Sequence, residues 1–288
     1  MLLYHASFSE VPADQRQRLH NNRPEAMYRH LKFLKRHYTF VPIDELAASR
    51  SCRGLAAVTF DDGYTCVLEE ALPVLEALKI PCTIFLNGAT MEKKVFWRDK
   101  VRCIINWNLS EKCSASFSRT KVVEGLSFYG YTKHPSNNSR IVDEEIECFA
   151  RQQGVRFESS QYCVGSLSDL RIHPLVTYGN HSHHHYVLSS LSRDDQYTEI
   201  EATHELLQSL PASSRCSAFS IPFGTTRDFN HDTVGILQDL GYSAALLSRN
   251  RLNSELPRDH GLTWIERFMP DERGMVRNLA KLMARSPA

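Results

Sequence analysis

Short apolar runs alternate with stretches of helical periodicity along most of this chain. The runs with the length of β-strands lie at 2–5, 38–43, 55–60, 82–86, 175–179, 216–221 and 243–247. The stretches with the apolar spacing of helices lie at 24–36, 67–79, 141–153 and 193–210. Pro24 suits the first turn of its helix, and Pro73 predicts either a kink or a helix start close to it.

This alternation of strand and helix predicts a parallel sheet covered by helices. About seven strands suit a closed or nearly closed barrel better than a small open sheet. We therefore expect an α/β fold, a distorted (β/α)7 barrel, with residues 1–288 forming one domain. Residues 108–140 are rich in Ser, Asn, Lys and Thr without a steady period, which indicates an excursion or mobile loop, and the variable region extends over about 108–160.

Composition excludes some classes of partner. The formal net charge of +1 gives no basic face for nucleic acid, and no apolar run is long enough for a membrane span. The first residues, MLLYHASF, are too short an apolar stretch for a signal peptide. The eight cysteines include no CxxC pair, which indicates free structural thiols in a cytoplasmic protein.

Two adjacent carboxylates, Asp61 and Asp62, directly follow the apolar run 55–60, and Gly63 permits a sharp exit from the strand. Two like charges at a strand end repel each other and lose water, so a bound cation would remove this cost for one of them. One aspartate can then bind a metal while the other acts as a base. A helix N-cap with turn chemistry is the alternative reading of such a sequence.

Four histidines occur within the five residues 181–185. His181 and His185 are four apart, so a helical turn would put both imidazoles on one face, a spacing that zinc sites use. His183 or His184 could instead partner one of them in an extended segment, and a solvated histidine-rich loop is the alternative without a metal. Two histidines and one carboxylate leave a metal position open for water, as catalytic sites do.

Three ordered motifs resemble those of the NodB-homology polysaccharide deacetylases, the family-four carbohydrate esterases: TFDDGY at 59–64, GNHSHHHYVLSSLS at 179–192 and FSIPFG at 219–224. Further segments resemble a subgroup from polysaccharide-biosynthesis settings: YH at 4–5, residues 24–47, FW at 96–97 and GYSAALLSRN at 241–250. The resemblance implies a barrel of the NodB type. It also implies a metal-dependent deacylase that removes an N-acetyl or N-formyl group from an amino sugar in a glycan or glycan precursor.

Residue by residue, the resemblance implies that Asp61 is the general base and that Asp62, His181 and His185 bind the metal. Zinc is the expected ion, although cobalt, nickel, manganese and iron also use such a ligand set. The ion would polarise the acyl carbonyl and acidify water, and Asp61 would take the proton of that water.

The third motif departs from the family pattern. In the family, the main-chain N–H of its aromatic residue helps to stabilise the oxyanion, and here that residue is Phe223, between Pro222 and Gly224. Ser220 stands where the family carries an arginine that orients the base. Arg267 in the IERF segment is a candidate for the missing group.

The usual C-terminal motif with a catalytic histidine is missing as well. Some relatives carry a YH near the start instead, so Tyr4-His5 suggests His5 as the acid that protonates the leaving amine. Tyr64 and Trp97 are candidates for contacts with the sugar, because aromatic faces suit pyranose rings. The other single histidines are interpreted as structural: His20, His30, His37, His134, His173, His204, His231 and His260.

Several alternatives stay open. The substrate is expected to be a carbohydrate that is nucleotide-linked, lipid-linked or an oligosaccharide. O-deacetylation is the nearest rival activity, and a carbohydrate-binding pseudoenzyme is suggested by the two missing groups. A metal-dependent hydrolase of small cyclic amides shares the fold family.

Overall fold

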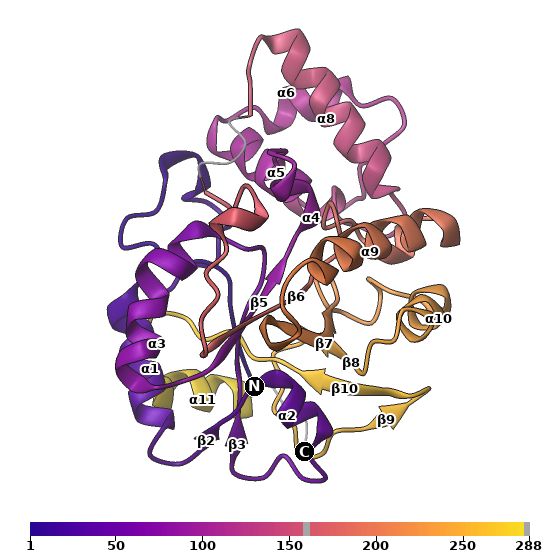
Figure 1. The fold of residues 1–288 in the computed structure, drawn as a ribbon. Coiled ribbons are helices and arrows are strands. Elements are labelled where there is room, and N and C mark those ends of the chain that lie inside the picture. The colour runs from indigo at the N-terminus through magenta and orange to yellow at the C-terminus, as the bar shows by residue number, and fades with distance from the viewer. Residues whose placement is uncertain (158–161, 285–288) are drawn as a thin grey trace.

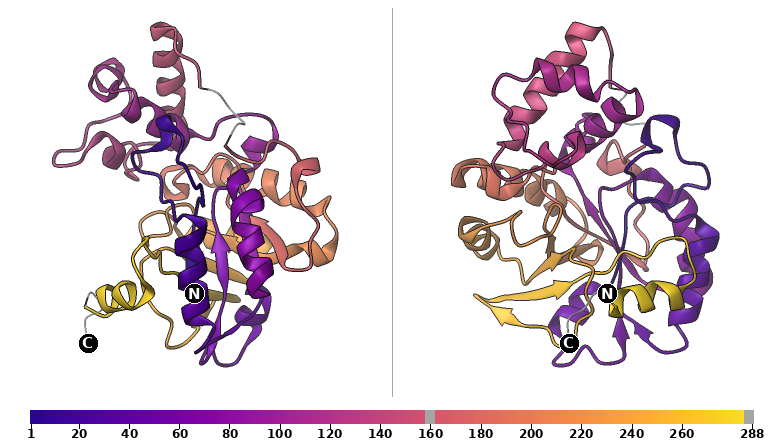
Figure 2. Two further views of the ribbon diagram at one scale, coloured as in Figure 1. Left: turned by 90° about the vertical axis from the view of Figure 1, so that its left-hand side faces the viewer. Right: turned by 180° about the vertical axis from the view of Figure 1, so that it is seen from behind.

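The computed structural model describes residues 1–157 and 162–284 and has the predicted α/β architecture (Figure 1, Figure 2). The main sheet contains, in spatial order, β1 (Leu2–Tyr4), β4 (Val58–Phe60), β5 (Cys82–Leu86), β6 (Val176–Asn180), β7 (Arg215–Ser220), β8 (Ala244–Leu247), β10 (Leu262–Glu266) and β9 (Arg258–Asp259). Every neighbouring pair is parallel except β10 with β9. Leu3 N–H donates to Phe268 O at 2.9 Å and Phe268 N–H donates to Met1 O at 3.1 Å, so the chain after β10 returns to β1. The expected distorted barrel of seven parallel strands is confirmed.

Helices cover the outside of this sheet. One side carries α1 (Pro24–Leu34), α3 (Leu72–Leu78) and α11 (Met275–Met283), and the other carries α9 (Arg193–Gln208) and α10 (His231–Asp239). The helix α2 (Ile43–Ala48) lies beside a small sheet of β2 (Thr39–Phe40) and β3 (Leu55–Ala56). Apolar spacing predicted the buried face of α1 correctly, and Pro73 lies in the first turn of α3, after a π-helical turn at Val67–Ala71. Short 3₁₀ turns lie at Ala13–Gln15, Leu167–Asp169, Leu188–Ser190 and Ala212–Ser214. None of the described helices has the length and apolar character needed to cross a membrane.

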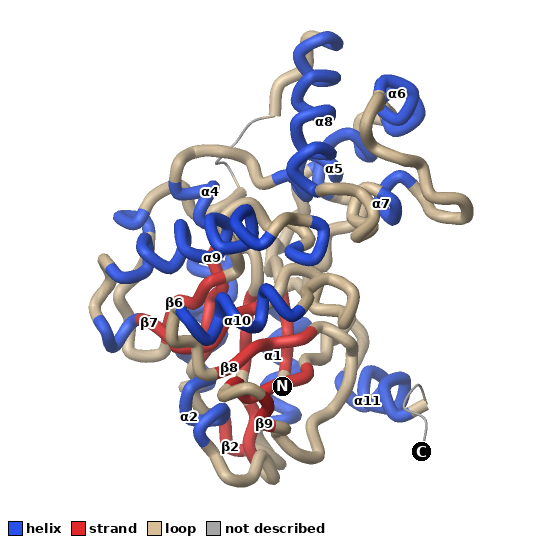
Figure 3. The backbone as a smooth tube through the Cα atoms, turned by 90° about the vertical axis from the view of Figure 1, so that its right-hand side faces the viewer, coloured by secondary structure: helices blue, strands red, loops and turns tan. Residues whose placement is uncertain are grey.

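Residues 97–153 form a helical lobe beyond the carboxyl ends of the strands (Figure 1, Figure 3). After α4 (Gly88–Met91), the lobe contains α5 (Trp97–Asn106), α6 (Ser110–Ser116), α7 (Phe128–Tyr131) and α8 (Ser139–Gln153). Residues 108–140, predicted as an excursion or mobile loop, lie within this lobe and include two short helices, α6 and α7, joined by segments without regular structure. This lobe has a core of its own, in which Cys113 and Phe128 pack with Val142. Because α6 and α7 are only seven and four residues long, neither shows a sequence period.

The carboxyl ends of the strands meet at one rim of the barrel, as expected for this architecture. His5 follows β1, Asp61 follows β4, and His181 follows β6. Ser220 ends β7, and Arg267 follows β10. Five residues from five distant parts of the chain are thereby brought to the same edge.

Candidate active site

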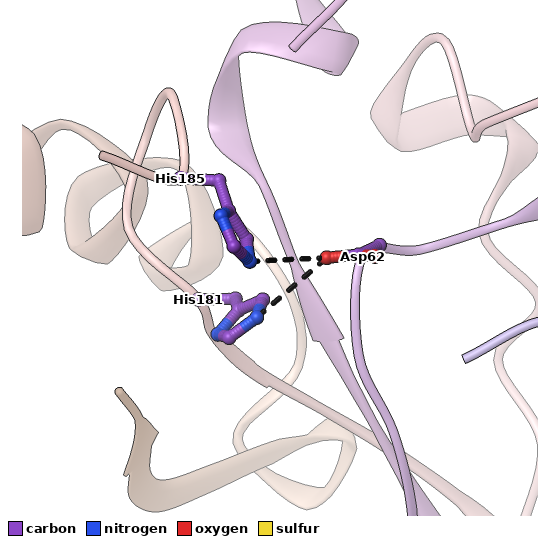
Figure 4. Close-up of side chains that lie close together, drawn as sticks. All are labelled: Asp62, His181 and His185. Carbon is purple, nitrogen blue, oxygen red and sulfur yellow. Dashed lines mark ion pairs between the residues drawn. The ribbon is translucent and has the colours of Figure 1, made fainter. Parts of the chain in front are cut away.

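Asp62, His181 and His185 meet at this rim (Figure 4). The Oδ1 of Asp62 lies 3.6 Å from Nε2 of His181 and 3.4 Å from Nε2 of His185. One ligand atom from each residue lies within 4.8 Å of the others, and all three side chains are buried. The structure thus brings together the three residues that the sequence analysis assigned to the metal.

The turn after β4 separates the two aspartates. Asp62 and Gly63 both have left-handed backbone conformations, with φ of +75° and +73°. Aspartate is one of the few residues that tolerate this region, and glycine adopts it freely. A Cβ at Gly63 would lie 2.9 Å from Leu86 Cδ2, so the available space also favours glycine there. Asp62 consequently faces both histidines. Asp61 lies 3.5 Å from Nε2 of His181 through its Oδ2, but its carboxylate is held by Arg267.

The histidine segment is an irregular loop and not the helical turn that the spacing suggested. Ser182 and His185 have φ of +64° and +62°, outside the helical region. The hydroxyl of Ser182 accepts a hydrogen bond from His185 N–H at 3.0 Å. The rings of His181 and His185 lie edge to face with centroids 4.6 Å apart. The tight turn of this loop therefore brings the two imidazoles together, as a helical turn would have done.

The two intervening histidines leave this cluster. Nε2 of His183 lies 3.3 Å from Glu92 Oε1, and Nδ1 of His184 lies 2.6 Å from Glu199 Oε1. Both side chains therefore point to carboxylates on other elements. The alternative in which one of them partners His181 or His185 is wrong.

A hydrogen bond fixes the His181 ring, whereas Nδ1 of the His185 ring is buried without a hydrogen-bond partner among the described residues. His181 Nδ1–H donates to Ser220 O at 2.7 Å, because a carbonyl can only accept, and this leaves the Nε2 lone pair toward Asp62. The main-chain oxygen of His185 accepts a hydrogen bond from Trp97 Nε1 at 2.6 Å. Burial lowers the pKa of both imidazoles, so both are neutral at pH 7. Neutral imidazole is the form that binds metals.

The electrostatics of Asp62 also fit a bound cation. Burial, with the charge of Asp61 beside it, raises the pKa of Asp62 to about 7, although Arg102 at 4.0 Å opposes the shift. A buried carboxylate between two neutral imidazoles is stabilised by a positive ion. One carboxylate and two imidazoles form a set that could hold zinc or a similar divalent ion.

Asp61 is held by a buried arginine from the last strand of the barrel. Arg267 Nη1 and Nη2 donate to the two carboxylate oxygens of Asp61 at 2.7 and 2.8 Å, a bidentate pair. Ser220 Oγ lies 3.1 Å from both oxygens and accepts from Arg267 Nη2 at 2.8 Å. Burial alone would raise the pKa of Asp61, but Arg267 and His181 lower it to about 2. The structure therefore places Arg267 where the third motif lacks its arginine.

The turn after β7 reaches the site through Phe223. Its φ is +62°, that of Gly224 is +66°, and Pro222 before them is buried. The ring of Phe223 lies edge-on to the ring of His185, with centroids 4.7 Å apart. Gly224 O accepts from Ser248 N–H at 2.9 Å, and a Cβ at Gly224 would lie 2.5 Å from that nitrogen. The Phe223 N–H has no hydrogen-bond acceptor among the described residues.

His5 lines the same cavity as Asp61 and is oriented by a second histidine. His5 Nδ1 lies 3.4 Å from His20 Nδ1, and His20 Nε2–H donates to Pro270 O at 2.8 Å. His20 Nδ1 is thereby left as an acceptor for His5 Nδ1–H. Burial, and next the neighbouring His20, hold the pKa of His5 well below its usual value. His20 and His134, both interpreted as structural from the sequence, line the cavity as well.

Tyr64 and Trp97 do not reach the cavity, so the prediction that they contact a sugar is wrong. Both side chains are wholly buried. Tyr64 OH donates to Asp99 Oδ1 at 2.8 Å and accepts from Arg102 Nη1 at 2.7 Å. Trp97 packs behind the histidine loop and holds the main chain of His185. Both residues therefore hold neighbouring parts of the site in place and do not line the cavity.

The cavity at the rim has a volume of about 430 Å³. Part of its lining is formed by Asp61, Asp62, the two clustered histidines and Phe223. Residues of the helical lobe, including Tyr129 and Lys133, form another part. The lobe also contributes Arg98 and Arg102 from α5. Sequence reasoning missed these two arginines, although their four-residue spacing placed them on one face of a helix. A charged stretch such as WRDKVRC is ordinarily a solvated surface, whereas here it is buried.

Comparisons with known proteins identify the family and the fold. The polysaccharide deacetylase family model matches residues 48–127 and 166–245, more than half of the chain. No curated protein sequence matches the chain at a significant level.

Three solved structures share the fold. The Streptococcus pyogenes deacetylase PplD has a TM-score of 0.58 at 15% identity, over 99% of this chain and 97% of that one. A polysaccharide deacetylase from Bacillus cereus has a TM-score of 0.56 at 16% identity, over 98% of this chain and 67% of that one. A de-N-acetylase from Aggregatibacter actinomycetemcomitans has a TM-score of 0.54 at 12% identity, over 98% of both chains.

Proposed function

The chain belongs to the polysaccharide deacetylase family, and we propose that it is a metal-dependent hydrolase that removes an acetyl or formyl group from the nitrogen of an amino sugar. The division of two adjacent aspartates between two environments carries this proposal. Asp62 faces two neutral imidazoles, whereas Asp61 is fixed by Arg267. One carboxylate is thus suited to bind a cation, and the other is left to accept a proton.

Asp62, His181 and His185 would hold the ion, with zinc the first candidate. A divalent cation bound there would polarise the acyl carbonyl and make a water molecule more acidic. The hydrogen bond from His181 to Ser220 O keeps the Nε2 lone pair available to it.

In this proposal Asp61 accepts the proton of the attacking water. Arg267 fixes both oxygens and lowers the pKa of Asp61, so the carboxylate is ionised and able to accept a proton at neutral pH. The oxygen of water adds to the acyl carbon, and the N–H of Phe223, which lacks another acceptor among the described residues, is suited to donate to the resulting oxyanion.

We further propose that His5 protonates the leaving nitrogen. The carbon–nitrogen bond breaks, the acyl group leaves as a carboxylate, and the sugar retains a free amine. His5 is held through Nδ1 by His20. Burial and His20 lower the pKa of His5, whereas the charge of Asp61 acts in the opposite direction, toward the protonated ring that an acid requires. His5, His20 and Asp61 line the same cavity, so the proposed acid and the proposed base face the same space.

The substrate is a carbohydrate, and an N-acyl sugar is preferred to an O-acetyl sugar by analogy with the neighbour named a de-N-acetylase. The carrier can be a nucleotide, a lipid or an oligosaccharide. A pseudoenzyme is disfavoured, because Arg267 and His5 stand where the two missing groups would act.

Two expectations about the whole chain are also proposals. One is a single deacetylase domain over residues 1–288 with a variable excursion at about 108–160, whose helices supply part of the cavity lining. The other is a cytoplasmic location, which agrees with eight free cysteines.

The test is hydrolysis of paired N-acetyl and O-acetyl sugars by the zinc-loaded protein, with release of acetate measured. We expect the N-acetyl sugars to be cleaved, and Asp61→Asn to lower kcat by about 100- to 10,000-fold, in the range of general-base catalysis. Zinc content should be unchanged in Asp61→Asn, because Asp61 is not assigned as a ligand.

Asp194→Asn is the matched control, since Asp194 is exposed on α9 outside the cavity. If Asp61→Asn were as active as the wild type, the assignment of the base would fail. Cleavage of O-acetyl sugars alone would make the protein an esterase, and zinc binding without any hydrolysis would support the pseudoenzyme.

A further inference from the structure

The candidate cavity carries more positive than negative side chains. Its lining includes five Lys and Arg residues: Arg18, Arg98, Arg102, Lys133 and Arg227. It includes three carboxylates: Asp61, Asp62 and Asp228. Arg102 is paired with Asp99 at 2.5 Å, and Asp61 is paired with Arg267. None of the other four cations forms an ion pair within 4.0 Å in the described part of the chain, although the charge of Asp228 acts on Lys133.

Arg98 is the most unusual of these cations. It is 0% exposed, and its guanidinium donates to Thr132 Oγ1 at 3.1 Å and to Tyr129 O at 3.2 Å, without a carboxylate among its partners. Its Nε is buried without an acceptor among the described residues. Burial of a guanidinium without a paired anion is costly, because the charge loses its hydration. The cost is only partly offset by the rings of Tyr129 and Trp97, whose centroids lie 4.1 and 4.7 Å from its Cζ.

Lys133 continues the same positive region across the cavity. Its Nζ lies 5.1 Å from the ring centroid of Tyr129 and 5.0 Å from that of Phe223. Burial would raise the pKa of Tyr129, but the charges of Arg98, Arg102 and Lys133 lower it to about 7. The local field therefore favours any negative group placed among these residues.

This positive region lies next to the reacting centre. Phe223, whose ring is 4.7 Å from His185, is also 5.4 Å from Arg98. A sugar whose acyl group lies at Asp62, His181 and His185 would place its neighbouring substituents beside Arg98 and Lys133. Arg18 and Arg227 are exposed and line the same cavity, where they would attract an anion before it enters.

We propose that the substrate of this site is an anionic amino sugar, with a phosphate ester or a carboxylate next to the acyl-bearing ring, and that Arg98 and Lys133 bind that anion. This inference rests on the proposed deacylase function. A neutral homopolymer of amino sugars would leave the buried Arg98 without a carboxylate or phosphate partner, whereas an anionic substituent would accept the free Nε–H.

The experiment compares three probes with the zinc-loaded protein: N-acetylglucosamine 1-phosphate, its neutral methyl glycoside, and a disaccharide of N-acetylglucosamine with glucuronate. Hydrolysis is measured with the wild type, and equilibrium binding with Asp61→Asn. We expect Lys133→Gln to weaken binding of a charged probe about tenfold, and Arg98→Gln about 10- to 100-fold, as for hydrogen bonds to charged groups. Binding of the neutral glycoside should change less than about twofold.

Lys112→Gln is the matched control, because Lys112 is an exposed lysine of the same helical lobe and lies outside the cavity lining. Lys133 has no hydrogen bond to another described residue, so Lys133→Gln decides the question if Arg98→Gln does not fold. A preference for the phosphate probe identifies a phosphorylated sugar, and a preference for the glucuronate probe identifies an acidic glycan.

The two proposals fail in different ways. Equal kcat/KM and equal affinity for charged and neutral probes, unchanged by Lys133→Gln, would overturn the anionic substrate and leave the deacylase standing. Charge-dependent binding without hydrolysis of any probe would overturn the deacylase and leave the anion site standing.

Discussion

The pairing of Arg267 with Asp61 gives the sharpest prediction about a single residue. Arg267→Gln removes the guanidinium that donates to both oxygens of Asp61, at 2.7 and 2.8 Å. It also removes hydrogen bonds to Leu247 O at 3.1 Å and Ser248 Oγ at 3.0 Å. The exposed fractions of the two paired side chains are 0% and 2%, so solvent does not screen this pair.

The expected loss of stability is large because one charge of a buried pair is left alone. Breaking such a pair by removing one partner costs about 3–5 kcal/mol of the free energy of unfolding. The double variant Asp61→Asn/Arg267→Gln removes both charges of this pair, so neither is left buried without its partner. We therefore expect it to be more stable than Arg267→Gln, with a coupling energy of about 2–3 kcal/mol in the double-mutant cycle.

Activity should respond through the pKa of Asp61. Burial raises the pKa of Asp61 and the charge of Arg267 lowers it. In Arg267→Gln the pKa of Asp61 is therefore expected to lie above the value of about 2 in the wild type. A base must be deprotonated, and the acidic limb of kcat/KM should therefore move to higher pH. The first assay is urea unfolding of the wild type, Asp61→Asn, Arg267→Gln and the double variant. The second is the pH profile of acetate release by the wild type and Arg267→Gln.

Arg249→Gln is the matched control, since Arg249 pairs with Glu266 near the same rim and does not contact Asp61. It should leave the acidic limb in place. Wild-type stability and an unshifted acidic limb in Arg267→Gln would refute the reasoning, because Asp61 would then not depend on Arg267.

Three further predictions follow from the same geometry. Gly224→Ala should destabilise the protein by more than about 1 kcal/mol in urea unfolding, because φ is +66° and the new Cβ would meet Ser248 N at 2.5 Å; unchanged stability would contradict this. Zinc at 100 times its Kd should raise stability by about 2.7 kcal/mol in the wild type. His181→Ala should abolish the zinc-induced rise in melting temperature and His184→Ala should retain it, whereas an equal response of both would count against the ligand set. Burial lowers the pKa of His30, so its contribution to stability is complete above about pH 6.5 and is lost as the pH falls; unfolding of metal-free protein from pH 7 to 5 should show a weaker pH dependence in His30→Gln than in the wild type.

Much of the fold could be predicted because its strands are fully buried and its helices are amphipathic. The apolar runs over 82–86 and 243–247 correspond closely to β5 and β8. Other boundaries were not visible. The run 55–60 divides into β3 and β4 in different sheets, and of 38–43 only Thr39–Phe40 is a strand. The strand Leu262–Glu266 was not predicted, since its run is short and mixed with polar residues.

The candidate ligands could be predicted because their chemistry is concentrated in short motifs. Asp62 and the two clustered histidines needed no tertiary information beyond the order of the strands. The parts that the sequence did not reveal depend on distant contacts. The buried environment of Arg98 arises where the helical lobe covers the rim, and the pairing of His5 with His20 arises where two loops meet.

The central claim is that a divalent ion is bound by one aspartate and two imidazoles while the adjacent aspartate stays with its arginine. Anomalous diffraction from crystals grown with zinc, measured on both sides of the zinc absorption edge, tests it directly. We expect one strong peak about 2.0–2.2 Å from Asp62, His181 Nε2 and His185 Nε2, with Asp61 still bound to Arg267. A peak at another position, or one bonded to Asp61 with Asp62 turned away, would contradict the account.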